Sequence, residues 1–594
     1  MRRGRHPNPV RPLWSVAAAG AESAPPETRN HHMTNSYAIG TSAIATAQKA
    51  LDLIGQNVAN ATTPGYHRVD PQLVSRTTGP NVTGVDIGSV TRYSLPAVRT
   101  AVLTGNGDQG RYTALLDTNR QIETALATGQ GGVGDKLESF FNQVEELTAR
   151  PDSLASRRTI LTAATDLSNQ LNATAGDIDR LRSDLGRKIG ATVDQVNTLA
   201  TRIASLNTQI LTKENRGLTA NDLRDQRDVA IDDLSKLIDV KIVEVPNGQI
   251  NVISGDSAVV VGEFANRFTV SQNANDDIVI TDTSAAATRT FRSGSLAGDV
   301  QSFNTDIPAL RARLDTLAGQ LIQKVNQVQA TGLGSTPITS LSGTNQASSV
   351  TAPLNAAGLP FSVQAGTLTV SVTNNNVSPA TRTNTAVAIN PATQSLTDIA
   401  TALSAVPGLT ATVNATSNTL DIQAQAGFSF DFAGRDTLPA GPGAVANTDT
   451  SGLLVALGVN GLFVGSSAAS IRVSPTISAD PTLLAAGRTG EVGDGTNLER
   501  LGAVRDVQAV ATRTLTQDFA DIAATLGSSI NSFDDLQTTQ TSALRELATQ
   551  EQATVGVDTN EELLKLLAFQ RMIQGASKYL SVVNTSMDAL FNII

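Results

Sequence analysis

The C-terminal stretch Leu566–Ile594 reads LLAFQRMIQGASKYLSVVNTSMDALFNII, and it decides how the end of the chain is expected to fold. Its apolar residues recur at alternating steps of three and four, which is the spacing of an amphipathic helix with one narrow seam. Such a seam usually packs on the core of its own domain. Chain ends are normally polar and frayed, however, so this position favours a partner helix. The seam consists of Leu566, Phe569, Ile573, Ala576, Leu580, Val583, Met587, Leu590 and Ile594.

A second seam lies near the other end of the chain. Its members follow helical spacing between residues 37 and 58, and they are Tyr37, Ile44, Ala47, Leu51, Ile54 and Val58. Asn60 suits the end of this helix. Thr63 is pushed to extended geometry by the following proline, and Pro64-Gly65 suits the central pair of a type II turn. Both ends of the chain therefore carry an apolar helical seam.

The region between residues 111 and 239 is predicted to be helical. Its longest helix runs from about Gln170 to Lys213, and at about 1.5 Å per residue it would be about 65 Å long. A polar turn follows at 214–217, and Asn221 can begin a further helix through Asp239. The apolar period then changes to two, which predicts a small β-hairpin region over 240–261 with a turn at Pro246-Asn247-Gly248. Helical spacing returns over 310–328.

Residues 331–480 differ in composition from the rest, because only nine of these 150 residues are charged. Alternating segments at 367–372, 385–389 and 419–423, separated by turn residues, predict strands. One helix is expected at 396–403. Beyond about residue 497 the pattern is helical again, so helical sequence brackets a β-rich insertion.

These patterns predict an α+β multidomain chain with terminal coiled-coil helices, an elongated helical-bundle domain with a small β-hairpin region, and an inserted β-rich domain. We place a disordered or wrongly assigned extension at 1–32, an N-terminal coiled-coil segment at 33–95 and the helical domain at 96–330. The inserted outer domain spans 331–490, the return helices 491–550, and the C-terminal coiled-coil helix 551–594.

Composition excludes several classes of function. The chain has no cysteine, which rules out disulfide scaffolds, thiolate metal sites and cysteine nucleophiles. Residues 1–32 carry five Arg and two Glu, whereas the remainder carries 39 basic and 52 acidic residues. An acidic body without basic blocks argues against nucleic acid or an anionic membrane as partner. No apolar run approaches the ~20 residues of a membrane-spanning helix.

The candidate catalytic features are weak. His67 is the only histidine outside the first 32 residues, and without a nucleophile motif beside it we expect an exposed loop histidine. The glycine-rich stretch 129–134 lacks the ending of a phosphate loop, so a helix–helix connection is expected. The acidic pairs at 145–146, 232–233 and 561–562 fit solvated helix faces. We therefore expect no catalytic, cofactor-binding or metal-binding residue.

The segment Asn57-Val-Ala-Asn60-Ala-Thr-Thr-Pro64-Gly65-Tyr66, placed after an amphipathic helix, resembles the signature of bacterial flagellar rod, hook and hook-associated axial proteins. The tail resembles theirs at 560–570 and 584–590. Two further blocks, Asn221–Asp228 and Gly493–Asn497, point to the hook-associated members. In this chain Ile573 stands where the family usually has an aromatic residue.

The resemblance implies a non-enzymatic building block of the flagellum that forms the layer between hook and filament. It implies export of the unfolded chain through the flagellar type III apparatus to the cell exterior, helped by a chaperone, and polymerisation through the paired terminal helices. The implied partners are further copies of the chain, hook protein, a second junction protein and flagellin. The alternatives are a hook or rod protein and, from other classes, a secreted adhesin or a flagellar muramidase.

Overall fold

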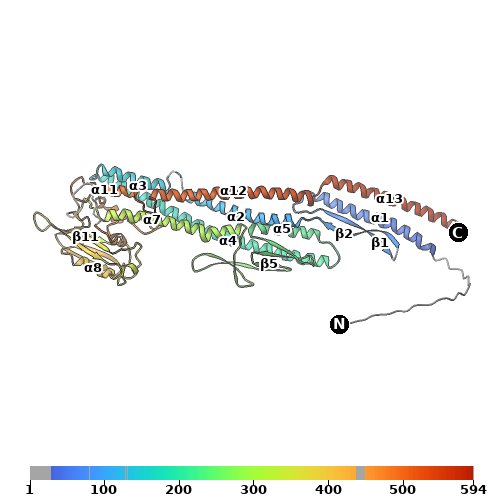
Figure 1. Cartoon of the computed structure of the whole chain (residues 1–594), viewed down its shortest axis with the longest axis horizontal. Coiled ribbons are helices and arrows are strands. Elements are labelled where there is room, and N and C mark those ends of the chain that lie inside the picture. Colours follow the sequence, from blue (N-terminus) through green and yellow to red (C-terminus); the bar gives the residue numbers. More distant parts are fainter. Residues whose placement is uncertain (1–27, 79–80, 127–128, 130, 436–447, 593–594) are drawn as a thin grey trace, which may run out of the picture. The chain divides into compact units, whose positions relative to one another are not determined.

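The computed structural model describes residues 28–78, 81–126, 129, 131–435 and 448–592 (Figure 1). The chain divides into two compact units. The terminal unit holds the described residues of 1–96, 217–225 and 549–594, and the central unit holds those of 97–216 and 226–548. The terminal unit is thus assembled from both ends of the sequence and one short internal segment.

In the terminal unit, two long helices lie side by side, and a two-stranded sheet covers the first of them (Figure 1). The elements are α1 (Thr28–Ala59), β1 (Val69–Thr78), β2 (Asn81–Arg92) and α13 (Thr559–Phe591). Helix α1 begins before the predicted start at Tyr37. The β1–β2 hairpin was not predicted, because its strands are polar, contain Pro71 and are interrupted by two register shifts. Period-two alternation is therefore lost.

The predicted turn after α1 is confirmed. Gly65 has φ +76°, which is the left-handed value that the third position of a type II turn requires. The backbone N–H of Tyr66 donates to Thr63 O at 3.2 Å and closes the turn.

The central unit is built on long helices. Helix α4 (Leu154–Glu214) is continuous over 61 residues, beginning well before the predicted Gln170, and Ser153 caps its first turn by accepting from the Ser156 N–H. The other principal helices are α2 (Pro96–Leu126), α3 (Val133–Thr148), α5 (Asn221–Leu237), α6 (Ser295–Gln301), the π-helix η1 (Ser302–Asp306), α7 (Ile307–Ala330) and α12 (Leu515–Val555). Helices α5 and α12 contribute residues to both units.

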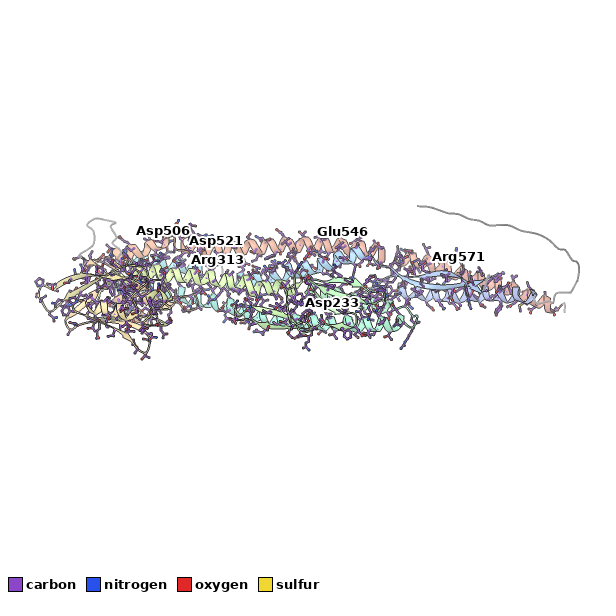
Figure 2. All side chains as sticks on the ribbon, turned by 60° about the horizontal axis from the view of Figure 1, so that its bottom comes forward. Asp233, Arg313, Asp506, Asp521, Glu546 and Arg571 are labelled. Carbon is purple, nitrogen blue, oxygen red and sulfur yellow. The ribbon has the colours of Figure 1, made fainter. Side chains whose placement is uncertain are left out.

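A continuous apolar core holds these helices together. Phe140 is fully buried and packs against Phe141 and Phe463, with ring centroids 5.2 and 5.7 Å apart. At the surface of the bundle, the Arg313 guanidinium on α7 donates to Asp521 on α12 at 2.8 Å (Figure 2). The apolar side chains of this core are thus buried within the unit itself.

The predicted hairpin region is larger than expected. It contains a four-stranded sheet and a three-stranded sheet. The strands are β3 (Lys241–Glu244), β4 (Ile250–Ser254), β5 (Ser257–Val261), β6 (Phe264–Ala265), β7 (Phe268–Gln272), β8 (Ile278–Asp282) and β9 (Ala287–Arg289). The predicted turn at 246–248 is confirmed by φ +81° at Gly248.

The β-rich insertion has its own apolar core. Two three-stranded sheets have the orders β12-β11-β15 and β10-β14-β13, and α8 packs on β13. The strands are β10 (Ser340–Ser342), β11 (Gly366–Asn374), β12 (Thr381–Ile389), β13 (Leu409–Asn414), β14 (Thr419–Ala424) and β15 (Phe428–Asp431). The predicted helix is observed as α8 (Leu396–Ser404), with a capping box of Ser395 and Asp398.

Two further short elements belong to the insertion, the 3-10 turn η2 (Leu354–Ala356) and α9 (Leu453–Leu457). The short elements that follow are β16 (Phe463–Val464), β17 (Arg472–Val473), α10 (Pro475–Ala479), η4 (Pro481–Leu483), α11 (Thr496–Ala503) and η5 (Val504–Asp506). The predicted return to helical structure after residue 497 is confirmed.

Five asparagines on helices close the ends or edges of strands. In each case the side-chain amide donates to the carbonyl oxygen of one strand residue and its oxygen accepts from that residue's N–H, as a neighbouring strand would. The pairs are Asn57 with Val69, Asn197 with Phe268, Asn207 with Ile250, Asn304 with Ile278 and Asn326 with Phe463. We call them the edge asparagines.

Candidate functional site

The candidate site is the seam between α1 and α13, where the predicted residues of both chain ends come together. On α13 the seam residues that the structure describes are half-buried and share one face. They are Leu566, Phe569, Ile573, Ala576, Leu580, Val583 and Met587. The side chain of Leu590 and all of Ile594 lie outside the described residues.

On α1, only some of the predicted seam residues are buried or half-buried. Ala47 and Ile54 are buried, and Ile44 and Leu51 are half-buried. Tyr37 and Val58, at the two ends of the predicted seam, are exposed in the single chain. Asn57 is fully buried beside the exposed Val58. Apolar spacing does not reveal this, because the last buried position on α1 is polar.

A glycine determines the contact at the far end of the seam, which is the end away from the turn motif. A Cβ atom placed on Gly40 would lie 2.6 Å from both Cγ and Cδ2 of Leu580. The two helices therefore approach so closely that Leu580 packs directly on the α1 backbone. Because Gly40 meets Leu580 while Asn57 meets Glu562, α1 and α13 run antiparallel.

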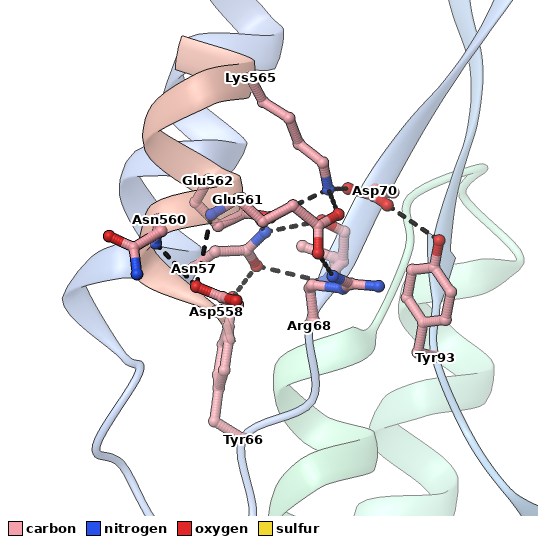
Figure 3. Close-up of polar contacts among 11 residues, drawn as sticks. Asn57, Tyr66, Arg68, Asp70, Tyr93, Asp558, Asn560, Glu561, Glu562 and Lys565 are labelled. Carbon is pink, nitrogen blue, oxygen red and sulfur yellow. Dashed lines mark hydrogen bonds and ion pairs between the residues drawn. The ribbon is translucent and has the colours of Figure 1, made fainter. Parts of the chain in front are cut away.

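Asn57 is the centre of the polar contacts at the near end (Figure 3). Its Nδ2 donates to Val69 O at 2.9 Å and to the Glu562 carboxylate at 2.8 Å. Its Oδ1 accepts from the Tyr66 hydroxyl at 2.8 Å and from the Val69 N–H at 3.1 Å. One amide thus ties together the helix, the turn, the first strand and α13.

Charged groups surround this amide (Figure 3). Glu562 is fully buried and accepts from Lys565 Nζ at 3.0 Å. Lys565 also donates to Asp70 at 2.8 Å, and Arg68 donates to Glu561 at 2.7 Å. The expectation that the pair 561–562 lies on a solvated face is therefore wrong for Glu562. We call this group the terminal polar cluster; it comprises Asn57, Tyr66, Arg68, Asp70, Tyr93, Glu561, Glu562 and Lys565.

The cluster shifts the pKa values of three of its members, Tyr66, Asp70 and Lys565. Burial, together with the Asp225 and Glu562 carboxylates, raises the pKa of Tyr66 to about 12, so its hydroxyl remains a donor. Burial alone would raise the pKa of Asp70, but hydrogen bonds from Lys565 and Tyr93 hold it below its usual range. Burial opposes the charge of Lys565, yet its three carboxylate partners raise its pKa above the usual range. Near neutral pH, Asp70 and Lys565 therefore stay charged, whereas Tyr66 stays neutral.

The remaining residues of the turn motif have local tasks. The Asn60 amide donates to Gln56 O at 3.0 Å and accepts from the Thr63 hydroxyl at 3.2 Å, which ends α1. Pro64 and Gly65 reverse the chain, and Tyr66 then reaches back to Asn57. The turn motif therefore reverses the chain so that Tyr66 packs back against the end of α1.

The prediction of an exposed loop histidine is wrong. His67 retains only 8 % of its accessible surface. Its Nδ1 lies 2.9 Å from Asp225 Oδ1 and 2.9 Å from Arg92 Nη2, while Arg92 also donates to Asp225. Asp225 comes from the internal segment of the terminal unit, so this triad fastens that segment to the turn. Sequence spacing could not place Asp225 beside His67.

Large apolar side chains remain exposed on the terminal unit. Leu73, Val74 and Val82 lie on the hairpin, and Leu563, Leu564, Leu567, Tyr579 and Val582 lie on α13. The site thus combines a buried polar cluster with large apolar side chains that remain exposed in the single chain.

No helix in the described ranges combines the length and the apolar character that crossing a membrane requires.

Comparison with known proteins agrees with this arrangement. Residues 119–341 match the family described as "Flagellar hook-associated protein FlgK helical domain", and residues 38–67 match "Flagella basal body rod protein". The chain is 25% identical to flagellar hook-associated protein 1 of Salmonella typhimurium over 93% of this chain and 98% of that protein. It is 26% identical to the Bacillus subtilis protein of the same name, over 49% of this chain and 66%, just under two thirds, of that protein.

Among solved structures, the flagellar hook junction protein FlgK from Burkholderia pseudomallei is similar, with 15% identity, a TM-score of 0.47, and coverage of 77% of this chain and 100% of that one. The rod-protein match covers the turn motif and most of α1 before it. The helical-domain match covers all of α4 and α7. The chain is therefore similar to flagellar hook-associated proteins in its turn motif, in its helical domain and, at 25% identity, along 93% of its length.

Proposed function

We propose that this chain is a non-catalytic structural subunit of the bacterial flagellum, located in the layer between hook and filament. The observation that carries the proposal is the terminal unit, in which the rod-type turn motif locks the first helix to the last. A protein built this way presents both chain ends as one assembly element.

The seam residues of α1 and α13 hold that element together in this proposal. The apolar side chains left exposed on the hairpin and α13 contact neighbouring subunits. The partners are further copies of this chain, hook protein, a second junction protein and flagellin. The insertion over 331–490 faces outward in this proposal.

We also propose export of the unfolded chain through the flagellar type III apparatus to the cell exterior, with a chaperone. The absence of cysteine supports this route, since no disulfide can lock the chain before export. The partial burial of the α13 seam supports this route too. A helix whose apolar face is only half-buried is marginally stable until partner contacts cover it.

The test uses a strain lacking the gene, complemented with variants. The strain without the chain should make hooks without filaments in electron micrographs. Leu564→Asp changes a side chain on α13 that is 68% exposed, so the monomer should fold normally but fail to join the layer. The variant and flagellin should then both appear in the medium.

Phe264→Asp is the matched control, because Phe264 is also 68% exposed but lies in the central unit. It should restore filaments. Normal filaments with Leu564→Asp, or filaments in the strain lacking the gene, would overturn the proposal.

A further inference from the structure

In several strands of this protein, side chains hydrogen-bond the backbone groups at a strand end or edge. An exposed edge offers unpaired N–H and C=O groups to other chains, so folds protect it with side chains, charges, short strands or covering elements. The edge asparagines close positions on β1, β4, β7, β8 and β16. Ser42 and Thr46 on α1 bind both backbone groups of Val85 on β2.

The insertion protects its edges as well. The Ser404 hydroxyl on α8 donates to Ala411 O and accepts from the Ala411 N–H, which closes β13. The Phe430 N–H on β15 donates to Ile338 O. The edge strand β10 has only three residues. β3 is also short and carries Lys241 and Glu244.

Among the described strands, β1 and β2 also have long outer edges, but they are interrupted by two register shifts and by Pro71, Gly84 and Gly88. Strand β12 has none of these protections. It forms the outer edge of the β12-β11-β15 sheet over nine residues, Thr381–Ile389, and pairs with β11 without a register shift. It contains no proline, glycine or lysine, and its single charge is Arg382. From Thr383 to Ile389 the strand is uncharged and rich in β-branched residues, the composition of a segment that pairs readily.

The register shows which backbone groups point outward. The Thr369 N–H donates to Thr448 O, on the side of β11 away from β12. Its partner across the sheet is Ala386, and in such a pair both residues turn their backbone groups away from each other. By alternation Asn384 and Ala388 also face outward. Ala388 O indeed accepts from the Gln394 amide at 3.3 Å.

The N–H and C=O groups of Asn384 and Ala386 therefore face outward with no partner within the ranges that the structure describes. We propose that this edge pairs antiparallel with β12 of a second copy of the chain. The strand is self-complementary about Thr385: Asn384 meets Ala386 of the second copy, and Arg382 meets Ala388. No like charges meet, and the outward groups pair with one another.

A contact of this kind uses the same patch on both copies, so it closes at two and does not propagate. It is therefore separate from the head-to-tail contacts that a layer requires. Strand addition at an edge derives its affinity from main-chain hydrogen bonds. The pairing does not depend on the terminal unit.

The experiment is sedimentation velocity of the full chain over a wide concentration range. The expected result is a monomer–dimer equilibrium. Ala386→Lys should weaken dimerisation at least about tenfold, because it places a charge in the pairing edge. Ala386→Pro should do the same by removing one outward N–H, a change that an edge strand tolerates without losing its fold.

Thr412→Lys is the matched control: it adds the same charge to an exposed position of β13, whose edge is already closed, and should leave the dimer unchanged. Hydrogen exchange should show amides of residues 384 and 386 slowing with concentration. A chain that is monomeric at every concentration overturns the proposal. So does a dimer that survives both Ala386 variants, or one that Leu564→Asp abolishes, since the contact would then lie elsewhere.

Discussion

The two units of this protein are stabilised in opposite ways. In the central unit, α3 and α4 bury full rows of Phe, Leu, Ile and Val, and the core continues into the small sheets. In the terminal unit, the polar side chains Asn57 and Glu562 are fully buried at the junction of α1 and α13, and the α13 side of the apolar seam is only half-buried. A unit with its own core folds alone, whereas a unit locked by polar contacts gains stability when neighbours cover it.

The largest expected effect tests the self-sufficiency of the central unit. Phe140→Ala removes a fully buried ring and should lower the free energy of unfolding of that unit by about 3–5 kcal/mol. Phe569→Ala on the half-buried seam should cost clearly less in the monomer. Denaturant unfolding followed by residue-resolved hydrogen exchange measures both; equal losses would remove the contrast between the units.

A somewhat smaller loss is expected for Asn57→Ala. It leaves the Val69 backbone, the Tyr66 hydroxyl and the buried Glu562 carboxylate short of partners, and should destabilise the docked α13 by about 3 kcal/mol. Exchange of the amides over 559–592 reports the change. Asn60→Ala, which loses only bonds within the turn, is the control and should cost less than about 1 kcal/mol. Matching losses in the two variants would contradict a central role for Asn57.

Gly40→Ala sharpens the comparison at the far end of the seam. The added methyl meets Leu580, and overpacking should outweigh the better helix propensity of alanine, for a net loss of about 1 kcal/mol. Gly55→Ala on the same helix meets nothing within 4 Å and should stabilise α1 slightly. Adding Leu580→Ala to Gly40→Ala should show favourable coupling in a double-mutant cycle; additivity would mean that the helices do not touch there.

The smallest expected effect is that of pH on the docking of α13, which should change little near neutral pH. Asp70 and Glu561 have lowered pKa values in the fold, so their stabilisation is present above the usual carboxyl range, near pH 4, and is lost as pH falls through the folded values. Lys565 has a raised pKa, so its contribution is complete below its usual value of 10.5 and is lost as pH rises beyond it. Docking of α13, followed by limited proteolysis, should be constant from about pH 5 to 9.

That docking should loosen below about pH 4. Asp70→Asn should reduce the acid sensitivity. Loosening between pH 5 and 7 would show that other groups control the junction.

Helices and seams were predictable from the sequence because their periodicity is local. The α13 seam, the type II turn at Pro64-Gly65 and α8 follow from spacing and capping. The β1–β2 hairpin escaped because its side chains do not alternate. The burial of His67 and Glu562 escaped because their partners, Asp225 and Asn57, are distant in sequence. A polar residue at the end of an apolar seam, such as Asn57, is the one signal that could have pointed to the cluster.

The antiparallel pairing of α1 and α13 has a mechanical consequence. Gly40 and Asn57 are fixed points about 26 Å apart along α1 at 1.5 Å per residue. Sliding one helix past the other by a single turn, about 5.4 Å, would drive Leu580 off its glycine and pull Glu562 from Asn57 at the same moment. The two locks share a shearing load instead of failing in sequence. A rotating shaft is loaded in shear. Under such a load, α1 and α13 cannot slide past each other until the Gly40–Leu580 and Asn57–Glu562 contacts both break.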